Sequence, residues 1–197
     1  EIIDAQGTVI GGSSLGAGNI ISGNYQICIF ISGTTTSGTT VQGNRIGTNP
    51  AGDTLLGNGE DGIVVEGAQA TTIGGSSAGA GNLISANGGF GVVVHAGASV
   101  TAVLGNLIGT NAAGASPLPN QLGGVLIDQA TGTVLGDNVI SGNTGPGVLV
   151  TGPSTSNTQI FNNRVGVNQA GAAALGNSGQ GLYILGAPGV SVLGNVI

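Results

Sequence analysis

The sequence predicts an all-β protein, a single parallel β-helix (β-solenoid) of about six coils with partial ends. Three observations predict it. Glycine makes up 42 of the 197 residues, and only 5% of residues are charged. Asparagine recurs at corresponding places in successive repeat units. Apolar segments of four or five residues, rich in β-branched side chains, lie between glycines, which is typical of short strands and not of helices.

Each repeat unit starts with an asparagine that is followed two residues later by isoleucine or valine. These starts are Asn19, Asn44, Asn82, Asn106, Asn138, Asn163 and Asn195. A second asparagine follows five residues later in six units, at Asn24, Asn49, Asn87, Asn111, Asn143 and Asn168. In a parallel stack, equivalent residues lie about 4.8 Å apart, so we expect the first asparagines to form a hydrogen-bonded ladder. Every second unit carries an extra loop, as at 50–59 and 112–122, where insertion costs little.

Each unit closes with a second apolar strand after a glycine, as in Gly62-Ile63-Val64-Val65-Glu66. The first and third residues after the glycine should point inward and the second outward. These second residues are Val64, Val93, Leu126, Leu149 and Tyr183. Because monomeric soluble proteins seldom expose long apolar patches, we expect this column to be an interface between copies of the chain.

These units resemble the right-handed parallel β-helix repeats of the pectin-lyase-like superfamily, especially bacterial secreted and surface proteins with many repeats. The resemblance rests on Gly-Asn-x-Ile elements such as 43–46 and Gly-Ile-x-Val strands such as 62–65, and it covers the whole chain. It implies one repeat domain over residues 1–197, as a mature form or a fragment of a longer array. It also implies an extracellular or cell-surface location. Members that cleave polysaccharides use clustered carboxylates on an outer face.

Few residues are available for a catalytic or metal site, because the chain has eight acids, two arginines and one histidine. Glu66, His95 and Asp128 each stand fourth after the glycine that opens a closing strand, so they should form one outward column. We interpret this column as surface charge, with a catalytic or metal-binding role as the alternative. Arg45 and Arg164 share a unit position four coils apart, about 19 Å, and we expect both to be solvated. We therefore assign no catalytic residue, no metal and no cofactor.

Composition excludes two classes of partner. Two arginines without any lysine argue against nucleic-acid binding, which depends on basic clusters. No apolar run approaches the 18–20 residues of a membrane-spanning helix.

The lone Cys28 lies in an apolar run and is expected to be a packed, unreactive thiol.

The leading functional hypothesis is a non-catalytic, structural, self-associating extracellular protein: a fibre or filament, a sheath, a surface-layer subunit or an adhesin stalk. Its partners would be copies of itself, as a homopolymer or homo-oligomer, with polysaccharide as a further candidate. One alternative is a polysaccharide lyase or hydrolase of the pectin-lyase-like type. Another is a passive glycan- or ice-binding module. Threonines at 34–40 suggest ice binding, but we expect no threonine column to repeat down the coils.

Overall fold

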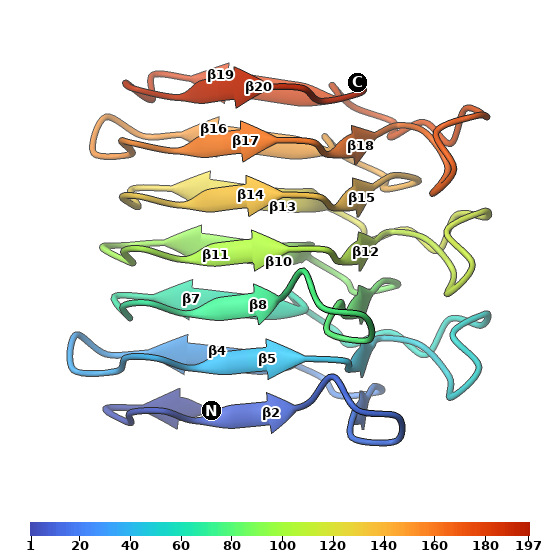
Figure 1. The fold of residues 1–197 in the computed structure, drawn as a ribbon, viewed down its shortest axis with the longest axis horizontal. Coiled ribbons are helices and arrows are strands. Elements are labelled where there is room, and N and C mark those ends of the chain that lie inside the picture. The colour runs from blue at the N-terminus through green and yellow to red at the C-terminus, as the bar shows by residue number, and fades with distance from the viewer.

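The computed structural model describes residues 1–197 and contains strands but no helix, and so no helix that could cross a membrane (Figure 1). The first sheet contains β1 (Ile2–Ile3), β4 (Ile29–Ser32), β7 (Ile63–Glu66), β10 (Phe90–His95), β13 (Gly123–Asp128), β16 (Val148–Thr151) and β19 (Leu182–Leu185). The second sheet contains β2 (Val9–Gly11), β5 (Thr40–Gln42), β8 (Thr72–Gly74), β11 (Ala102–Leu104), β14 (Val134–Gly136), β17 (Gln159–Phe161) and β20 (Ser191–Leu193). The third sheet contains β3 (Ile20–Ile21), β6 (Arg45–Ile46), β9 (Leu83–Ile84), β12 (Leu107–Ile108), β15 (Val139–Ile140) and β18 (Arg164–Val165).

The three sheets form a β-solenoid, because the chain visits them in turn. Three consecutive strands make one coil, so coil 1 holds β1 to β3 and coil 6 holds β16 to β18, with β19 and β20 in a partial seventh. Each strand pairs in parallel with its equivalent in the next coil, as in Ile46↔Ile84 and Val103↔Leu135. The predicted all-β parallel β-helix of about six coils with partial ends is confirmed.

The core consists of narrow interior columns that run along the coil axis. In β7, Ile63 and Val65 are fully buried inside the coil and alternate with the outward Val64. Register then stacks Val65 between Ile31 and Val94 of the neighbouring coils. Because the interior is only a few side chains wide, branched aliphatic residues fill it, and aromatic residues are only 3% of the chain.

The predicted asparagine ladder stands at the corner between the second and third sheets and is confirmed. Asn82 Nδ2 donates to Asn106 Oδ1 at 2.9 Å, and Asn106 Nδ2 donates to Asn138 Oδ1 at 3.0 Å. The same bond continues at both ends of this series. The complete ladder is Asn19, Asn44, Asn82, Asn106, Asn138, Asn163 and Asn195. Its central members are buried, so the ladder supplies the hydrogen bonds that their amide groups require.

The second asparagines of the repeat divide into two structural kinds. Asn24, Asn87 and Asn143 are of one kind and belong to a second ladder between the third and first sheets. The complete second ladder is Asn24, Asn58, Asn87, Asn120, Asn143 and Asn177. In coils 2, 4 and 6 the ladder asparagine follows the unit start by fourteen residues instead of five, because a side loop precedes it. The other kind is Asn49, Asn111 and Asn168, which lie at the start of these loops. Asn111 Oδ1, for example, accepts the N–H groups of Ala115 and Ser116.

A threonine column runs down the inside of the corner between the first and second sheets. It consists of Thr39, Thr71, Thr101, Thr133 and Thr158, each fully buried and each directly before a strand of the second sheet. The prediction that no threonine column repeats is therefore wrong. The column takes one threonine from each of coils 2 to 6, and only Thr39 of these lies in the threonine-rich stretch at 34–40. Because the column is internal, it offers no outward face to ice, and its hydroxyls have no hydrogen-bond partner in the chain.

Candidate functional site

Loops flank the outer face of the third sheet on both sides. Residues 12–18 and 75–81 lead from the second sheet into β3 and β9 in coils 1 and 3. Residues 49–57, 111–119 and 168–176 follow β6, β12 and β18 and project from the stack on the other side (Figure 1). Between these walls lies a groove of about 780 Å³, lined by residues from six successive coils. The groove therefore runs along the coil axis.

The projecting loops, which we call the side loops, form one continuous wall. Ala112 N–H donates to Gly52 O at 2.8 Å, and Gln169 N–H donates to Gly114 O at 2.8 Å. Gly52 has a φ of 74°, and a β-carbon there would lie 2.7 Å from Leu83 Cδ2. Only glycine fits this approach of the loop to the sheet, because it has no side chain and tolerates a positive φ. These contacts hold the wall in a fixed position against the sheet.

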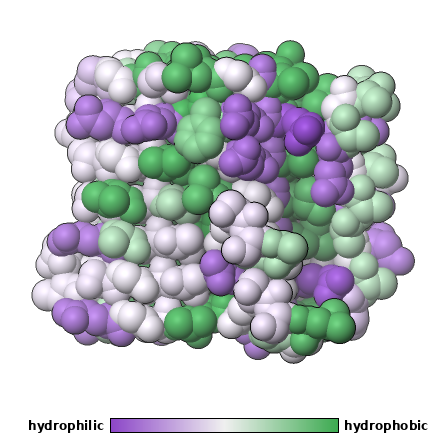
Figure 2. Space-filling model, in the orientation of Figure 1, coloured by the Kyte–Doolittle hydropathy of each residue, from purple (hydrophilic) through white to green (hydrophobic).

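The floor of the groove is the outward face of the third sheet. Register stacks Arg45, Leu83, Leu107, Val139 and Arg164 in this order. Leu83 and Val139 are buried, while Leu107 and the two arginines are half-buried. Figure 2 shows apolar surface at the bottom of the furrow between the coils and the side loops. The floor is thus an apolar strip with a guanidinium group at each end.

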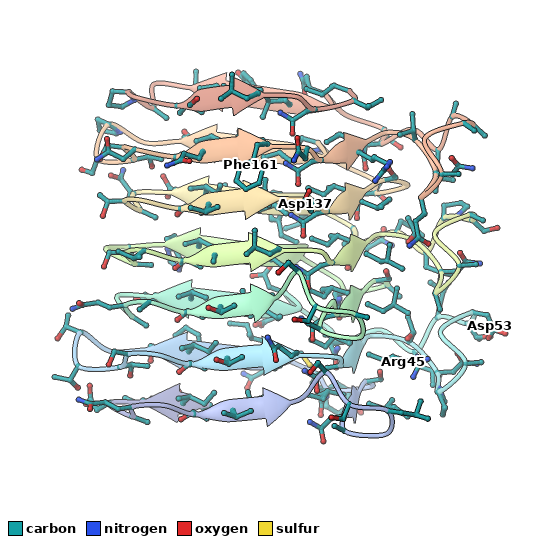
Figure 3. All side chains as sticks on the ribbon, viewed as in Figure 1. Arg45, Asp53, Asp137 and Phe161 are labelled. Carbon is teal, nitrogen blue, oxygen red and sulfur yellow. The ribbon has the colours of Figure 1, made fainter.

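Both arginines point outward, as expected, and lie half-buried in this groove. Arg45 lies against Gly52 and Arg164 lies against Gly171, each in the side loop of its own coil. Figure 3 shows Arg45 between the coil stack and the side loop, with Asp53 at the loop's outer edge. Neither guanidinium lies within ion-pair distance of a carboxylate, because the one such contact in the chain joins His95 and Glu66. Neither guanidinium donates a hydrogen bond within the chain. Each guanidinium therefore keeps its N–H donors available for a ligand.

Charge in the groove is opposite in sign to the charge of the chain. Arg45, Arg164 and Asp137 are its only charged residues, which gives a formal charge of +1, whereas the whole chain carries −6. Asp53 lies outside the groove lining, and hydrogen bonds from Asn49 and Thr54 hold its pKa below the usual value. Fixed positive charge between low-dielectric walls attracts anions to this face of an otherwise acidic protein.

The predicted column of Glu66, His95 and Asp128 lies on the first sheet, away from this groove. Register pairs His95 with Glu66 on one side and with Asp128 on the other. His95 Nε2 lies 3.5 Å from Glu66 Oε2, and the two side chains are 33% and 44% exposed. No group of three or more histidine, cysteine, aspartate or glutamate side chains is arranged to hold a metal ion. The structure thus brings two of the three residues into direct contact at the surface.

The predicted interface residues are register neighbours on the outer face of the first sheet, in the order Val64, Val93, Leu126, Leu149 and Tyr183. Their exposure differs from the prediction at one end. Val64 and Val93 are only 3% and 6% exposed. In register, Val64 lies between Phe30 and Val93 of the neighbouring coils, and Val93 lies between Val64 and Leu126. Leu126 and Leu149 are half-buried, and Tyr183 is 39% exposed. Of these five residues, the more exposed ones are therefore the three in the C-terminal half of the column.

Sequence reasoning missed the groove, although a signal for it was present. The intervals Asn44 to Asn58, Asn106 to Asn120 and Asn163 to Asn177 are all fourteen residues. Equal insertions in every second coil predict loops that stack on one side of the sheet. Two such loops beside an arginine at the same unit position then indicate a lined groove.

Comparison with known proteins agrees with this architecture. A family model described as "Right handed beta helix region" matches residues 18–197, so the chain belongs to this family. The predicted resemblance to right-handed parallel β-helix repeats is confirmed. A search of curated protein sequences finds no match.

Among solved structures, the fold is similar to that of the periplasmic alginate epimerase AlgG. The TM-score is 0.65 at 14% sequence identity, over 98% of this chain and 46% of that one. Two mutant structures of the same enzyme give TM-scores of 0.64 and 0.60, also at 14% identity. Our chain thus spans about half the length of these proteins, and the similarity shows the fold alone.

Proposed function

We propose that this protein is a non-catalytic binding protein that holds a linear acidic polysaccharide in the groove over the third sheet. One observation carries the proposal: the two arginines of an acidic chain that has no lysine are unpaired and line one groove along the coil axis. The groove volume is within the range of ligand sites. The similarity in fold to an alginate epimerase supports a role on polysaccharides.

Each part of the groove has a role in this binding. Arg45 and Arg164 bind carboxylate groups of the polymer, because a planar guanidinium matches a carboxylate through two parallel hydrogen bonds. Leu107, the most exposed of the apolar floor residues, contacts the C–H faces of the sugar rings. The glycine- and serine-rich wall at 75–81 offers backbone and hydroxyl groups to the sugar hydroxyls. The location that suits such a ligand is the cell surface, the extracellular space or the periplasm.

The charged residues of the groove favour binding over hydrolysis. Hydrolysis of a glycosidic bond uses two carboxyl groups at about 5–9.5 Å from each other. Asp137 is the single carboxylate in the groove, and its φ of 57° places it at a corner next to the Asn138 ladder residue. We therefore propose that the polymer is bound without being hydrolysed.

Isothermal titration calorimetry at low salt tests this function. Soluble β-1,4-polyglucuronate and alginate should bind, and hydroxyethyl cellulose, which is uncharged, should bind far more weakly. Arg45→Gln and Arg164→Gln should each weaken binding about tenfold, and added salt should weaken it further. Glu66→Gln, on the first sheet, is the matched control and should leave the affinity unchanged.

Asp137→Asn provides an independent check with the opposite sign. Removal of the only groove carboxylate should strengthen binding of the acidic polymers. The change is conservative for the backbone, because Asn162 holds the equivalent corner in the next coil with a φ of 54°. Equal affinity for charged and uncharged polymers, or full affinity in the double arginine variant, would contradict the proposed function.

Self-association is a second proposal, favoured by the exposed part of the first-sheet column. Leu126, Leu149 and Tyr183 form a continuous apolar strip, and a second copy of the chain that covers it would remove this strip from water. Sedimentation velocity over a wide concentration range should show an oligomer that Leu149→Thr weakens. A monomer at all concentrations would contradict it. Fibre, sheath, surface-layer or stalk architectures would all build on this contact.

A further inference from the structure

The distance between the two groove arginines is fixed by the register of the third sheet. Arg45 pairs with Leu83, Leu83 with Leu107, Leu107 with Val139 and Val139 with Arg164. The arginines are thus four coil steps apart, or about 19 Å. Neighbouring asparagine ladders and the stacked side loops hold these coils in register, so a ligand that contacts both arginines must match this distance.

The repeat of an extended sugar polymer matches the repeat of the coils. A 1,4-linked pyranose chain in a two-fold ribbon advances by nearly one coil spacing per sugar unit, so a chain along the groove stays in step with the coils. Successive units of such a ribbon turn their substituents to opposite sides. Units separated by an even number of steps turn them to the same side. The four-step separation of Arg45 and Arg164 meets this condition.

We infer that the groove binds one sugar unit per coil of a two-fold, 1,4-linked acidic polymer, and that Arg45 and Arg164 bind the carboxylates of units four apart. This inference rests on the proposed function and adds to it a length requirement. The shortest ligand that contacts both arginines has about five units. Shorter ligands contact only one arginine, and longer ones gain no further charged contact within the groove.

The distance between the two groove arginines can be changed by placing an arginine at another position of the same third-sheet column. Coil 4 repeats the surroundings of coils 2 and 6, because its side loop, 111–119, has the same place as the loops beside Arg45 and Arg164. Leu107 in coil 4 stands two steps from Arg45, an even number. Val139 in coil 5 stands three steps from Arg45, an odd number. Val139 is buried, so arginine there must be shown to reach the groove, by a gain in binding of the long polymer in the Arg45→Gln, Arg164→Gln background. Arginine at these two positions then distinguishes a register effect from a simple gain of charge.

The experiment is calorimetry with β-1,4-linked glucuronate oligosaccharides of two to eight units, with cello-oligosaccharides of equal length as the uncharged control. For the wild type, affinity should rise about tenfold between four and five units and then level off. Arg164→Gln and Arg45→Gln should each abolish this rise in affinity. In Leu107→Arg combined with Arg164→Gln, the rise should occur between two and three sugar units. In Val139→Arg combined with Arg164→Gln, affinity should not rise between three and four units.

Circular dichroism of every variant confirms that the coils are intact before titration. A smooth rise of affinity with length, or a step at five units that persists in both single arginine variants, would overturn the register inference. The proposed function would survive that result if the long polymer still bound. Absence of binding for every acidic oligosaccharide and for the polymer would instead overturn both.

Discussion

Asn82 gives two hydrogen bonds to one oxygen of Asn106. The Nδ2 group and the backbone N–H of Asn82 both donate to Asn106 Oδ1, at 2.9 and 3.0 Å. Asn106 makes the same pair of bonds to Asn138 Oδ1. The arrangement ties the start of each third-sheet strand to its neighbour, and these strands carry the groove floor. The ladder is therefore what positions Arg45 and Arg164 relative to each other.

Loss of one ladder residue should destabilise the fold strongly. Asn106→Leu removes the amide that donates to Asn138 Oδ1, Ile73 O and Leu104 O, and it leaves Asn82 without its acceptor. Each buried group left unpaired costs about 1–3 kcal/mol, so we expect a total loss of at least about 3 kcal/mol. Urea unfolding monitored by circular dichroism measures it.

The control for this prediction is Asn162→Gly, in the same corner but exposed. Asn162 has a φ of 54°, and Gly105 and Gly43 hold the equivalent place in other coils. Glycine accepts this conformation, so the free energy of unfolding should change by less than about 0.5 kcal/mol. Similar losses for Asn162→Gly and Asn106→Leu would refute the ladder argument.

Two asparagines with the same spacing in sequence should behave differently. Asn87 and Asn111 each follow a unit start by five residues, but Asn87 is a buried member of the second ladder and Asn111 anchors an exposed loop. Asn87→Ala should cost about 2 kcal/mol or more in the free energy of unfolding. Asn111→Ala should leave it nearly unchanged and should speed hydrogen exchange of the Ala115 and Ser116 amides. Equal losses in the free energy of unfolding for Asn87→Ala and Asn111→Ala would contradict the division of these asparagines into ladder and loop residues.

The internal threonine column predicts a stabilising substitution. Thr101 Oγ1 is buried without a partner, and the equivalent place in the last coil is held by Val190. Thr101→Val should leave stability unchanged or raise it by up to about 1 kcal/mol, because it replaces an unpaired hydroxyl with a methyl group. Thr101→Ser, which keeps the hydroxyl and loses the methyl, should destabilise the protein. A loss of more than about 1 kcal/mol in the valine variant would mean that a bound water satisfies the hydroxyl.

Cys28 should be unreactive in the folded protein. Its thiol lies 3.5 Å from Ile21 O, and burial raises its pKa from 9.0 to about 12. The thiolate is the reactive form, so iodoacetamide at pH 8 should modify Cys28 slowly when folded and rapidly in urea. The unfolded chain loses this proton near pH 9 and the folded chain only near 12. Stability should therefore fall as the pH rises from about 9 to 12, and Cys28→Ala should reduce this fall. Rapid modification of the folded protein would contradict the packed thiol.

The sequence predicts the repeat well, because each coil repeats the same physical requirement. Asn44 and Asn82 must both place an amide at the same corner, and Ile46 and Ile84 must both fill the same interior column. Such requirements recur at fixed positions and can be counted without coordinates. This is why the coil number, the first ladder and the register column of Glu66 with His95 follow from spacing alone.

What the spacing leaves open is how closely the side loops approach the sheet. The hydrogen bond from Ala112 N–H to Gly52 O, which recurs between Gln169 and Gly114, builds the groove wall and holds Gly52 against the sheet. The half-burial of Arg45 results from the approach of that loop, so composition alone suggested a solvated side chain. Val64 is similarly buried between its register neighbours, and alternation along one strand does not report such burial.

A crystal structure with a β-1,4-linked glucuronate hexasaccharide tests the central claim most directly. We predict that the sugar lies along the third sheet between the side loops and the wall at 75–81. One carboxylate should lie within hydrogen-bond distance of the Arg45 guanidinium and another within hydrogen-bond distance of Arg164. A sugar bound along the first sheet near Glu66 and His95, or one in the groove that touches neither arginine, would contradict the claim.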